Sequence, residues 1–287
     1  MDDDVRVLHM AAFAAEPGGG NPAGVVPDAS ALSDERMQHI AAELGYPESA
    51  FVVDPAVGGD PRRARLRYFS PGAEIPFCGH ATIATAVWFA GERGPGEFTF
   101  ETNVGPVVIA TAEADGRITA SFTSVDPELR DLDVRVQAEL LGLLGLSEED
   151  LDPRLPLRES FAGNWHPIVV IRDQAVFDAF SFDPLAMREL MDARGWTGTV
   201  TVVHALSDAA DEFDARNLFP VGAITEDPAT GSAAASLGAY LRAIGAVAPP
   251  ARLTIRQGRH VGRPSILRVQ IPVEGGITVT GTAEITD

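Results

Sequence analysis

The sequence lacks lysine and has almost no cysteine. All 22 basic residues of the 287-residue chain are arginine, and Cys78 is the one cysteine. Without lysine the protein forms no Schiff base, which excludes pyridoxal-phosphate enzymes and aldimine-forming aldolases. The chain also has no lysine for a phosphate-binding loop, so the common nucleotide-hydrolysing class is excluded. A lone cysteine forms no internal disulfide, and a chain of this length buries a core without one.

Positive charge and long apolar runs are scarce as well. With 41 acidic against 22 basic residues, the formal net charge is −19. Nucleic acids and anionic membrane surfaces bind clustered cations, so we expect neither as a partner. No apolar stretch approaches membrane-spanning length, and Met1-Asp2-Asp3-Asp4 is acidic where a secretory signal is basic. We therefore expect a cytoplasmic protein.

Short runs of β-branched and aromatic residues alternate with turn signals along the chain, which indicates a mixed fold rich in strands. After Ser33, apolar residues recur at helical spacing until Gly45. The segments 81–90 and 233–244 are different, because they are apolar on nearly every face. A helix of that kind is buried on all sides, so we expect a curled sheet around each one.

Both apolar segments belong to an internal repeat. The residues Glu74-Ile-Pro-Phe-Cys-Gly-His-Ala81 align with Glu226-Asp-Pro-Ala-Thr-Gly-Ser-Ala233 at an offset of 152 residues. Upstream of these copies, Arg67 parallels Arg216. A repeat at about half the chain length indicates two copies of one structural unit.

We therefore predict an α+β fold of two pseudo-symmetric domains, each a curled, mostly antiparallel sheet or barrel around a central buried helix. The predicted domains are residues 1–128 and 129–287, with the last strand able to cross to the first domain. The active site is expected in the cleft between them.

Each copy of the repeat places a glycine, Gly79 or Gly231, at the start of a buried helix. Unpaired backbone N–H groups and the helix dipole make such a start a binding site for anions, which suits a small carboxylate substrate. The alternative is that both glycines only permit tight turns. Three polar residues lie at these starts: His80 in the first copy, and Asp227 and Ser232 in the second.

Several motifs, taken together in this order, resemble the phenazine-biosynthesis isomerase family, known as PhzF-like proteins. The resemblance covers roughly residues 5–280 and rests on the segments Asn21-Pro-Ala-Gly-Val-Val26, Glu48-Ser-Ala-Phe-Val52, Arg67-Tyr-Phe-Ser-Pro71, Phe77-Cys-Gly-His-Ala-Thr82, Glu226-Asp-Pro-Ala-Thr-Gly-Ser-Ala233 and Gln257-Gly258 with Gly262-Arg-Pro-Ser265. It implies a diaminopimelate-epimerase-like fold, a homodimer and no cofactor. The founding enzyme isomerises trans-2,3-dihydro-3-hydroxyanthranilate.

The resemblance also implies roles for individual residues. The acid/base glutamate of the family matches Glu48, which by itself reads equally as an exposed loop charge. The substrate-orienting histidine and aspartate match His80 and Asp227, which complete the catalytic set. The residues that hold the substrate match Gly79, Gly231 and Ser232, and we add Asn21 as a side chain able to bond to the substrate.

Metal and thiol chemistry are not expected. The six histidines show no metal-ligand spacing, although a ligand set assembled in space stays open. Related racemases of this fold use two opposed cysteines, whereas the repeat partner of Cys78 is Thr230, whose hydroxyl is far too weak an acid to replace a thiolate. We interpret Cys78 as a small buried packing residue. His166 is a less favoured candidate for lining the cleft.

The leading hypothesis is a cofactor-independent isomerase that moves a proton on a small cyclic or unsaturated amino or hydroxy acid, with Glu48 as the acid/base group. A second is another cofactor-free proton transfer at the same site, such as epimerisation or elimination. A third is a non-catalytic, dimeric scaffold that binds a small acid. The sequence does not separate the first two, because the residues that select the substrate are not identifiable in it.

Overall fold

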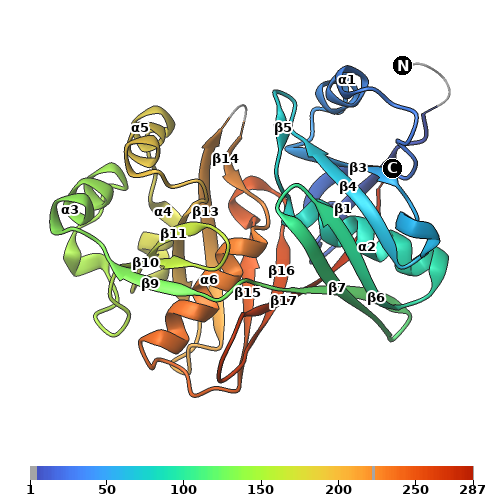
Figure 1. The fold of residues 1–287 in the computed structure, drawn as a ribbon. Helices are drawn as coiled ribbons and strands as arrows, with labels where there is room; N and C mark the ends of the chain where they lie inside the picture. Colours follow the sequence, from blue (N-terminus) through green and yellow to red (C-terminus); the bar gives the residue numbers. More distant parts are fainter. Residues whose placement is uncertain (1–4, 222–223, 287) are drawn as a thin grey trace. The chain divides into compact units, whose positions relative to one another are not determined.

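The computed structural model describes residues 5–221 and 224–286, which form two compact units (Figure 1). Unit 1 consists of the described residues within Met1–Thr123 and Thr280–Asp287, and unit 2 of those within Ser124–Val279. The acidic residues 1–4, on which the expected location partly rests, lie outside the described residues. In the described part of the chain, no helix is both long and apolar enough to span a membrane.

Unit 1 is built on a closed barrel of eight strands. Neighbouring strands pair in the order β1–β2–β3–β4–β6–β7–β8–β17, and β17 pairs back with β1. The strands are β1 (Leu8–Ala12), β2 (Asn21–Val26), β3 (Glu48–Asp54), β4 (Arg63–Phe69), β6 (Gly96–Thr102), β7 (Gly105–Ala114), β8 (Arg117–Thr123) and β17 (Thr278–Ile285). Closure leaves the barrel strands no unpaired edge.

Helix α2 (Gly79–Arg93) is enclosed by this sheet. Ten of its residues are buried, including every position from His80 to Val87, and it packs against β1, β2, β3, β7 and β8. Near the far end, the Phe89 ring meets the edges of Phe98 and Phe100 with centroids 5.7 and 5.5 Å away. Because the helix has no polar face, burial on all sides is the arrangement that removes its apolar surface from water.

Unit 2 repeats this order of strands. Along β9–β10–β11–β12–β13–β15–β16 the pairings are antiparallel, antiparallel, parallel, antiparallel, parallel and antiparallel, as they are along β17–β1–β2–β3–β4–β6–β7. The strands are β9 (Glu128–Asp131), β10 (Arg158–Phe161), β11 (Trp165–Val170), β12 (Val200–Ala205), β13 (Glu212–Val221), β15 (Ala251–Gln257) and β16 (Ser265–Ile271). Helix α6 (Gly231–Ala243) is the counterpart of α2 and is buried from Ala233 to Leu241.

The repeated arginine and glutamate pair with each other in both units. A short strand precedes each buried helix: β5 (Glu74–Ile75) pairs with β4, and β14 (Ile224–Asp227) pairs with β13. Arg67 donates two hydrogen bonds to Glu74, and Arg216 donates two to Glu226. The repeat therefore preserves a two-pronged ion pair across the hairpin that leads into each helix.

The remaining helices lie between strands. Helix α1 (Asp34–Leu44) begins after the predicted cap Ser33 and ends at Gly45, which has a φ of 65°. Three helices of unit 2 were not predicted, although each begins after a capping aspartate: α3 (Val134–Leu143), α4 (Gln174–Ala179) and α5 (Pro184–Arg194). Short 3-10 turns are η1 (Val57–Gly59), η2 (Glu148–Asp150) and η3 (Arg259–Val261).

The predicted α+β fold class is confirmed. The apolar helices begin two residues earlier than their periodicity indicated, at Gly79 and Gly231, so the two glycines occupy equivalent helix starts. The predicted boundary between domains at residue 128 stays a prediction.

The two buried helices give opposite predictions for a glycine-to-alanine change. A Cβ at Gly238 of α6 would lie 3.0 Å from Ile277 and 3.1 Å from Val269, whereas at Gly91 of α2 its nearest neighbour, Ile118, is 3.9 Å away. Overpacking costs about 1–3 kcal/mol, while a tolerated Gly→Ala change stabilises by about 0.4–1 kcal/mol. In urea unfolding we expect Gly91→Ala to raise the free energy of unfolding and Gly238→Ala to lower it. Equal shifts of the same sign would contradict the packing described here.

Candidate functional site

In unit 1 the start of α2 lies beside the beginnings of two parallel strands. Strands β2 and β3 are paired so that Ala23 lies opposite Glu48, the first residue of β3. Asn21, the first residue of β2, is fully buried. The parallel pairing brings these two strand starts to the same edge, next to the residues that open the helix.

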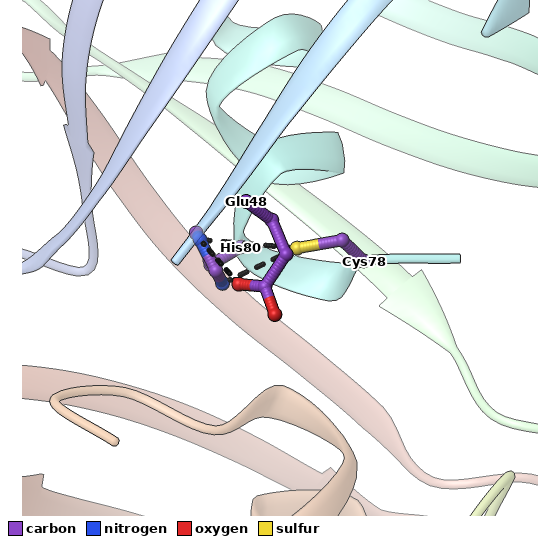
Figure 2. Close-up of side chains that lie close together, drawn as sticks. All are labelled: Glu48, Cys78 and His80. Atoms are coloured by element: carbon purple, nitrogen blue, oxygen red, sulfur yellow. Dashed lines mark hydrogen bonds and ion pairs between the residues drawn. The ribbon is translucent and has the colours of Figure 1, made fainter. Parts of the chain in front are cut away.

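Glu48, Cys78 and His80 come together at this place (Figure 2). The Nε2 atom of His80 is 3.6 Å from a carboxylate oxygen of Glu48, and its Nδ1 atom is 3.4 Å from the sulfur of Cys78. The His80 side chain is 7% exposed and that of Glu48 is 19% exposed. The Glu48 side chain is therefore mostly buried but still in contact with solvent, whereas an ordinary surface carboxylate is mostly exposed.

His80 is a neutral ring near neutral pH. Burial disfavours the charged imidazolium and lowers the pKa of His80 to about 4, although a hydrogen bond to the carbonyl of Pro22 acts in the opposite direction. A neutral imidazole keeps one donor and one acceptor nitrogen. At neutral pH its contact with Glu48 is therefore a polar contact and not an ion pair.

Cys78 is buried, as its reading as a packing residue predicted, but the sequence did not show its neighbours. It is the N-cap residue of α2, and its carbonyl accepts a hydrogen bond of 2.6 Å from the Thr82 hydroxyl. The Thr82 hydroxyl lies 2.7 Å from that of the buried Tyr68. These bonds fix the backbone of Cys78 at the helix start. The sulfur then lies in contact with the ring of His80.

In unit 2, Asp227 ends β14 and its surroundings hold it in place. The Thr230 hydroxyl donates a bond of 2.5 Å to the Asp227 carboxylate. The amide of Gln257 donates to the backbone carbonyl of Asp227 at 2.6 Å and to the Thr230 hydroxyl at 3.0 Å, and accepts from the Thr230 backbone at 3.2 Å. This explains the Gln257-Gly258 motif, because a Cβ at Gly258 would lie 2.7 Å from the carbonyl of Pro228.

Ser232, in the first turn of α6, contacts a buried histidine. Its hydroxyl lies 3.1 Å from Nε2 of His166, which is fully buried. The other ring nitrogen lies 2.9 Å from the carbonyl and 3.1 Å from the backbone nitrogen of Thr199. Gly198 makes room for the ring, since a Cβ there would lie 2.5–2.9 Å from three ring atoms. His166 thus fixes the hydroxyl of a predicted substrate-binding residue.

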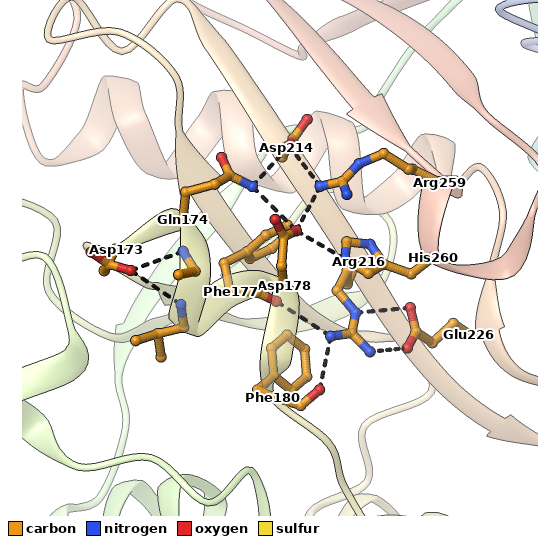
Figure 3. A network of polar contacts seen from close by, with 12 residues as sticks. Asp173, Gln174, Phe177, Asp178, Phe180, Asp214, Arg216, Glu226, Arg259 and His260 are labelled. Atoms are coloured by element: carbon orange, nitrogen blue, oxygen red, sulfur yellow. Dashed lines mark hydrogen bonds and ion pairs between the residues drawn. The ribbon is translucent and has the colours of Figure 1, made fainter.

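Glu226, the residue before Asp227, belongs to a wider network of polar contacts (Figure 3). The Arg216–Glu226 pair is buried, with both side chains 9% exposed. Arg216 also donates to the carbonyls of Phe177 and Phe180 at the end of α4. Arg216 donates four hydrogen bonds in all, so we assign its guanidinium to holding β13, β14 and α4 together.

The predicted residues therefore gather within each unit. Unit 1 brings Glu48 and His80 together, and unit 2 places Asp227, Gly231 and Ser232 around the start of α6. Sequence reasoning missed the contact between Cys78 and Glu48, the hydrogen bonds that Gln257 makes around Asp227, and the contact of His166 with Ser232. Only three-dimensional proximity reveals these, because Cys78 and Glu48, Gln257 and Thr230, and His166 and Ser232 are 27 or more residues apart in the chain.

Comparison with known proteins gives a family and several relatives. Residues 10–286 match the family model of the phenazine biosynthesis-like proteins. The chain is 32% identical to the trans-2,3-dihydro-3-hydroxyanthranilate isomerase of Pseudomonas aeruginosa, over 98% of this chain and 95% of that protein. It is 30% identical to an uncharacterized isomerase of Bacillus subtilis, over 98% and 96%. A crystal structure of a PhzF-family protein from Bacillus anthracis matches 99% of this chain and 97% of its own, with 27% identity and a TM-score of 0.84.

Burial of His166 predicts a pH dependence of stability. Burial lowers its pKa from 6.5 to about 4. Between these values the unfolded chain binds a proton that the folded chain does not. The free energy of unfolding therefore falls as the pH falls, by up to about 1.4 kcal/mol per pH unit.

We expect His166→Gln to have a shallower decline between pH 6.5 and 4.5 than the wild type, measured by urea unfolding. The comparison uses slopes, so a constant loss of stability in the variant does not affect it. Identical slopes would show that the His166 ring is protonated in the folded state.

Proposed function

The chain belongs to the phenazine biosynthesis-like protein family, and we propose that it is a cofactor-independent isomerase in which Glu48 moves a proton within a small acid. Its relatives carry the name isomerase, and the chain is an isomerase of this family. The substrate class that we propose is a small cyclic or unsaturated amino or hydroxy acid resembling trans-2,3-dihydro-3-hydroxyanthranilate, the substrate named for the Pseudomonas aeruginosa relative.

The observation that carries the proposal is the contact between Glu48 and His80. Moving a hydrogen between two carbons of a small acid needs one group that removes a proton from one carbon, holds it and returns it to the other. The Glu48 side chain is 19% exposed, and one of its carboxylate oxygens lies 3.6 Å from His80. The neutral ring of His80 places a polar nitrogen beside the Glu48 carboxylate. It carries no full positive charge, which would lower the pKa of Glu48 and weaken that carboxylate as a base.

We propose that the other predicted residues bind and orient the substrate. The starts of α2 and α6, at Gly79 and Gly231, offer backbone N–H groups and the positive ends of helix dipoles to a carboxylate. Ser232 and Asn21 are proposed to add hydrogen bonds. Asp227 is proposed to orient the substrate, because Thr230 and Gln257 already hold its own position.

The thiol pair of related racemases has no counterpart here. Thr230 stands at the N-cap of α6, where Cys78 stands at the N-cap of α2. The Thr230 hydroxyl donates a hydrogen bond to Asp227, and a hydroxyl is far too weak an acid to replace a thiolate. This favours a carboxylate-based isomerase over two-thiol epimerisation. A homodimer in the cytoplasm, implied by the resemblance, completes the proposal, and light scattering tests the dimer.

Glu48→Gln is the direct test. The amide keeps the size of the side chain but neither accepts nor returns the proton, so turnover of trans-2,3-dihydro-3-hydroxyanthranilate should fall by about 10²–10⁴-fold. The measurement is deuterium incorporation from heavy water into substrate and product, followed by NMR. Glu113→Gln is the matched control, because Glu113 is exposed on β7. Exchange at the wild-type rate in Glu48→Gln would remove Glu48 from the mechanism.

Asp227→Asn should act differently. It keeps the size but loses the charge that accepts the Thr230 bond, so we expect KM to rise and kcat to fall together, each by about tenfold or more. Steady-state kinetics on the same compound gives both constants. A normal KM with a kcat as low as that of Glu48→Gln would assign the proton transfer, and not the orientation, to Asp227.

A further inference from the structure

Three metal-ligating atoms of different chemistry meet at the start of α2: the Glu48 carboxylate, the Cys78 sulfur and a His80 nitrogen. These atoms all lie within 4.8 Å of one another (Figure 2). Across residues 5–221 and 224–286, no other group of three such donors lies this close together. The isomerase mechanism uses Glu48 and His80 but assigns no role to the thiol.

The spacing of these atoms is close to that of a tetrahedral zinc site. Nε2 of His80 is 3.8 Å from the Cys78 sulfur and 3.6 Å from a Glu48 oxygen. With usual Zn–S, Zn–N and Zn–O lengths, the corresponding edges of a tetrahedron are about 3.5 Å and 3.4 Å. The third edge, between the Cys78 sulfur and a Glu48 oxygen, is at most 4.8 Å, against about 3.6 Å in the tetrahedron. Rotations of these two flexible side chains by up to about 1.2 Å at their ligand atoms would therefore join all three atoms to one ion.

The surroundings support binding by this set. The Pro22 carbonyl holds the His80 ring, and such second-shell bonds orient ligating histidines. The backbone of Cys78 is held by bonds from Thr82. A sulfur, a nitrogen and one carboxylate suit Zn²⁺, whereas Mg²⁺ and Ca²⁺ prefer oxygen alone.

Unit 2 contains an internal comparison. The repeat places Thr230 where Cys78 stands and Ser232 where His80 stands, and both hydroxyls are already engaged, with Asp227 and His166. Neutral hydroxyls are not among the ligands that zinc prefers. Any tight zinc binding through a helix start therefore belongs to α2 and has a stoichiometry of one ion per chain.

We propose that Glu48, Cys78 and His80 bind one Zn²⁺ ion, and that this ion inhibits the isomerase by occupying the carboxylate that moves the proton. The thiol loses its proton to solvent as the Zn–S bond forms, so binding releases one proton and involves no oxidation or reduction. The inhibitory role rests on the proposed function, whereas the metal site does not.

The test uses the metal-free full chain and Co²⁺ as a spectroscopic substitute for Zn²⁺. We expect one equivalent of Co²⁺ to give a sulfur-to-cobalt charge-transfer band in the near ultraviolet, and Zn²⁺ to displace it. Cys78→Ser should abolish the band, and both this variant and Glu48→Gln should weaken Zn²⁺ binding by about tenfold or more. His39→Gln is the matched control, because His39 and Glu43 form an exposed pair at 3.4 Å without a third donor. Absence of the band in the wild type, or unchanged zinc affinity in both ligand variants, would overturn the site.

The inhibitory role has a separate readout. One bound equivalent of Zn²⁺ should stop deuterium exchange into the substrate, Mg²⁺ should not, and a chelator should restore the exchange. Exchange that continues with zinc bound would overturn the inhibition. Failure of the proposed function is seen independently, as absence of exchange in the metal-free protein, and the cobalt spectrum still decides whether the site exists.

Discussion

The enclosure of a helix that has no polar face is the constraint on which the rest of this structure depends. Helix α2 cannot leave any side open to water, so eight strands surround it, and α6 is buried in the same way in unit 2. Polar chemistry is then confined to the helix starts, where backbone N–H groups lack intrahelical partners and charged or polar groups are favourable. Gly79, His80, Gly231 and Ser232 lie at these starts for that reason, and Glu48 reaches His80 from the beginning of β3.

The two copies of the repeat have kept their backbone and changed their chemistry. Both begin the helix at a glycine and both cross the preceding hairpin with an arginine–glutamate pair, yet the pair is partly exposed at Arg67–Glu74 and buried at Arg216–Glu226. A buried pair that loses one partner is far more damaging than an exposed one. Unit 2 therefore depends on its hairpin charges much more than unit 1 does.

Much of the architecture was predictable because its signals can be read directly from the order of the residues. The apolar segments and the cap at Ser33 are local patterns, the 152-residue repeat appears when the chain is aligned with itself, and each corresponds to an observed element. The helices α3, α4 and α5 were missed, since their capping aspartates are common in loops and α4 has only six residues. The contacts of Cys78 with Glu48 and of His166 with Ser232 join residues 30 and 66 positions apart, and no periodic pattern encodes such pairs.

Strand β17 gives this chain an unusual order of assembly. It is the eighth strand of the first barrel, yet it is translated after nearly the whole of unit 2. Domains generally fold as they leave the ribosome, the N-terminal one first, but here β1 and β8 keep unpaired edges throughout that period. Helix α2 therefore stays incompletely covered until β17 has been translated, so the nascent chain exposes apolar surface that the folded protein buries.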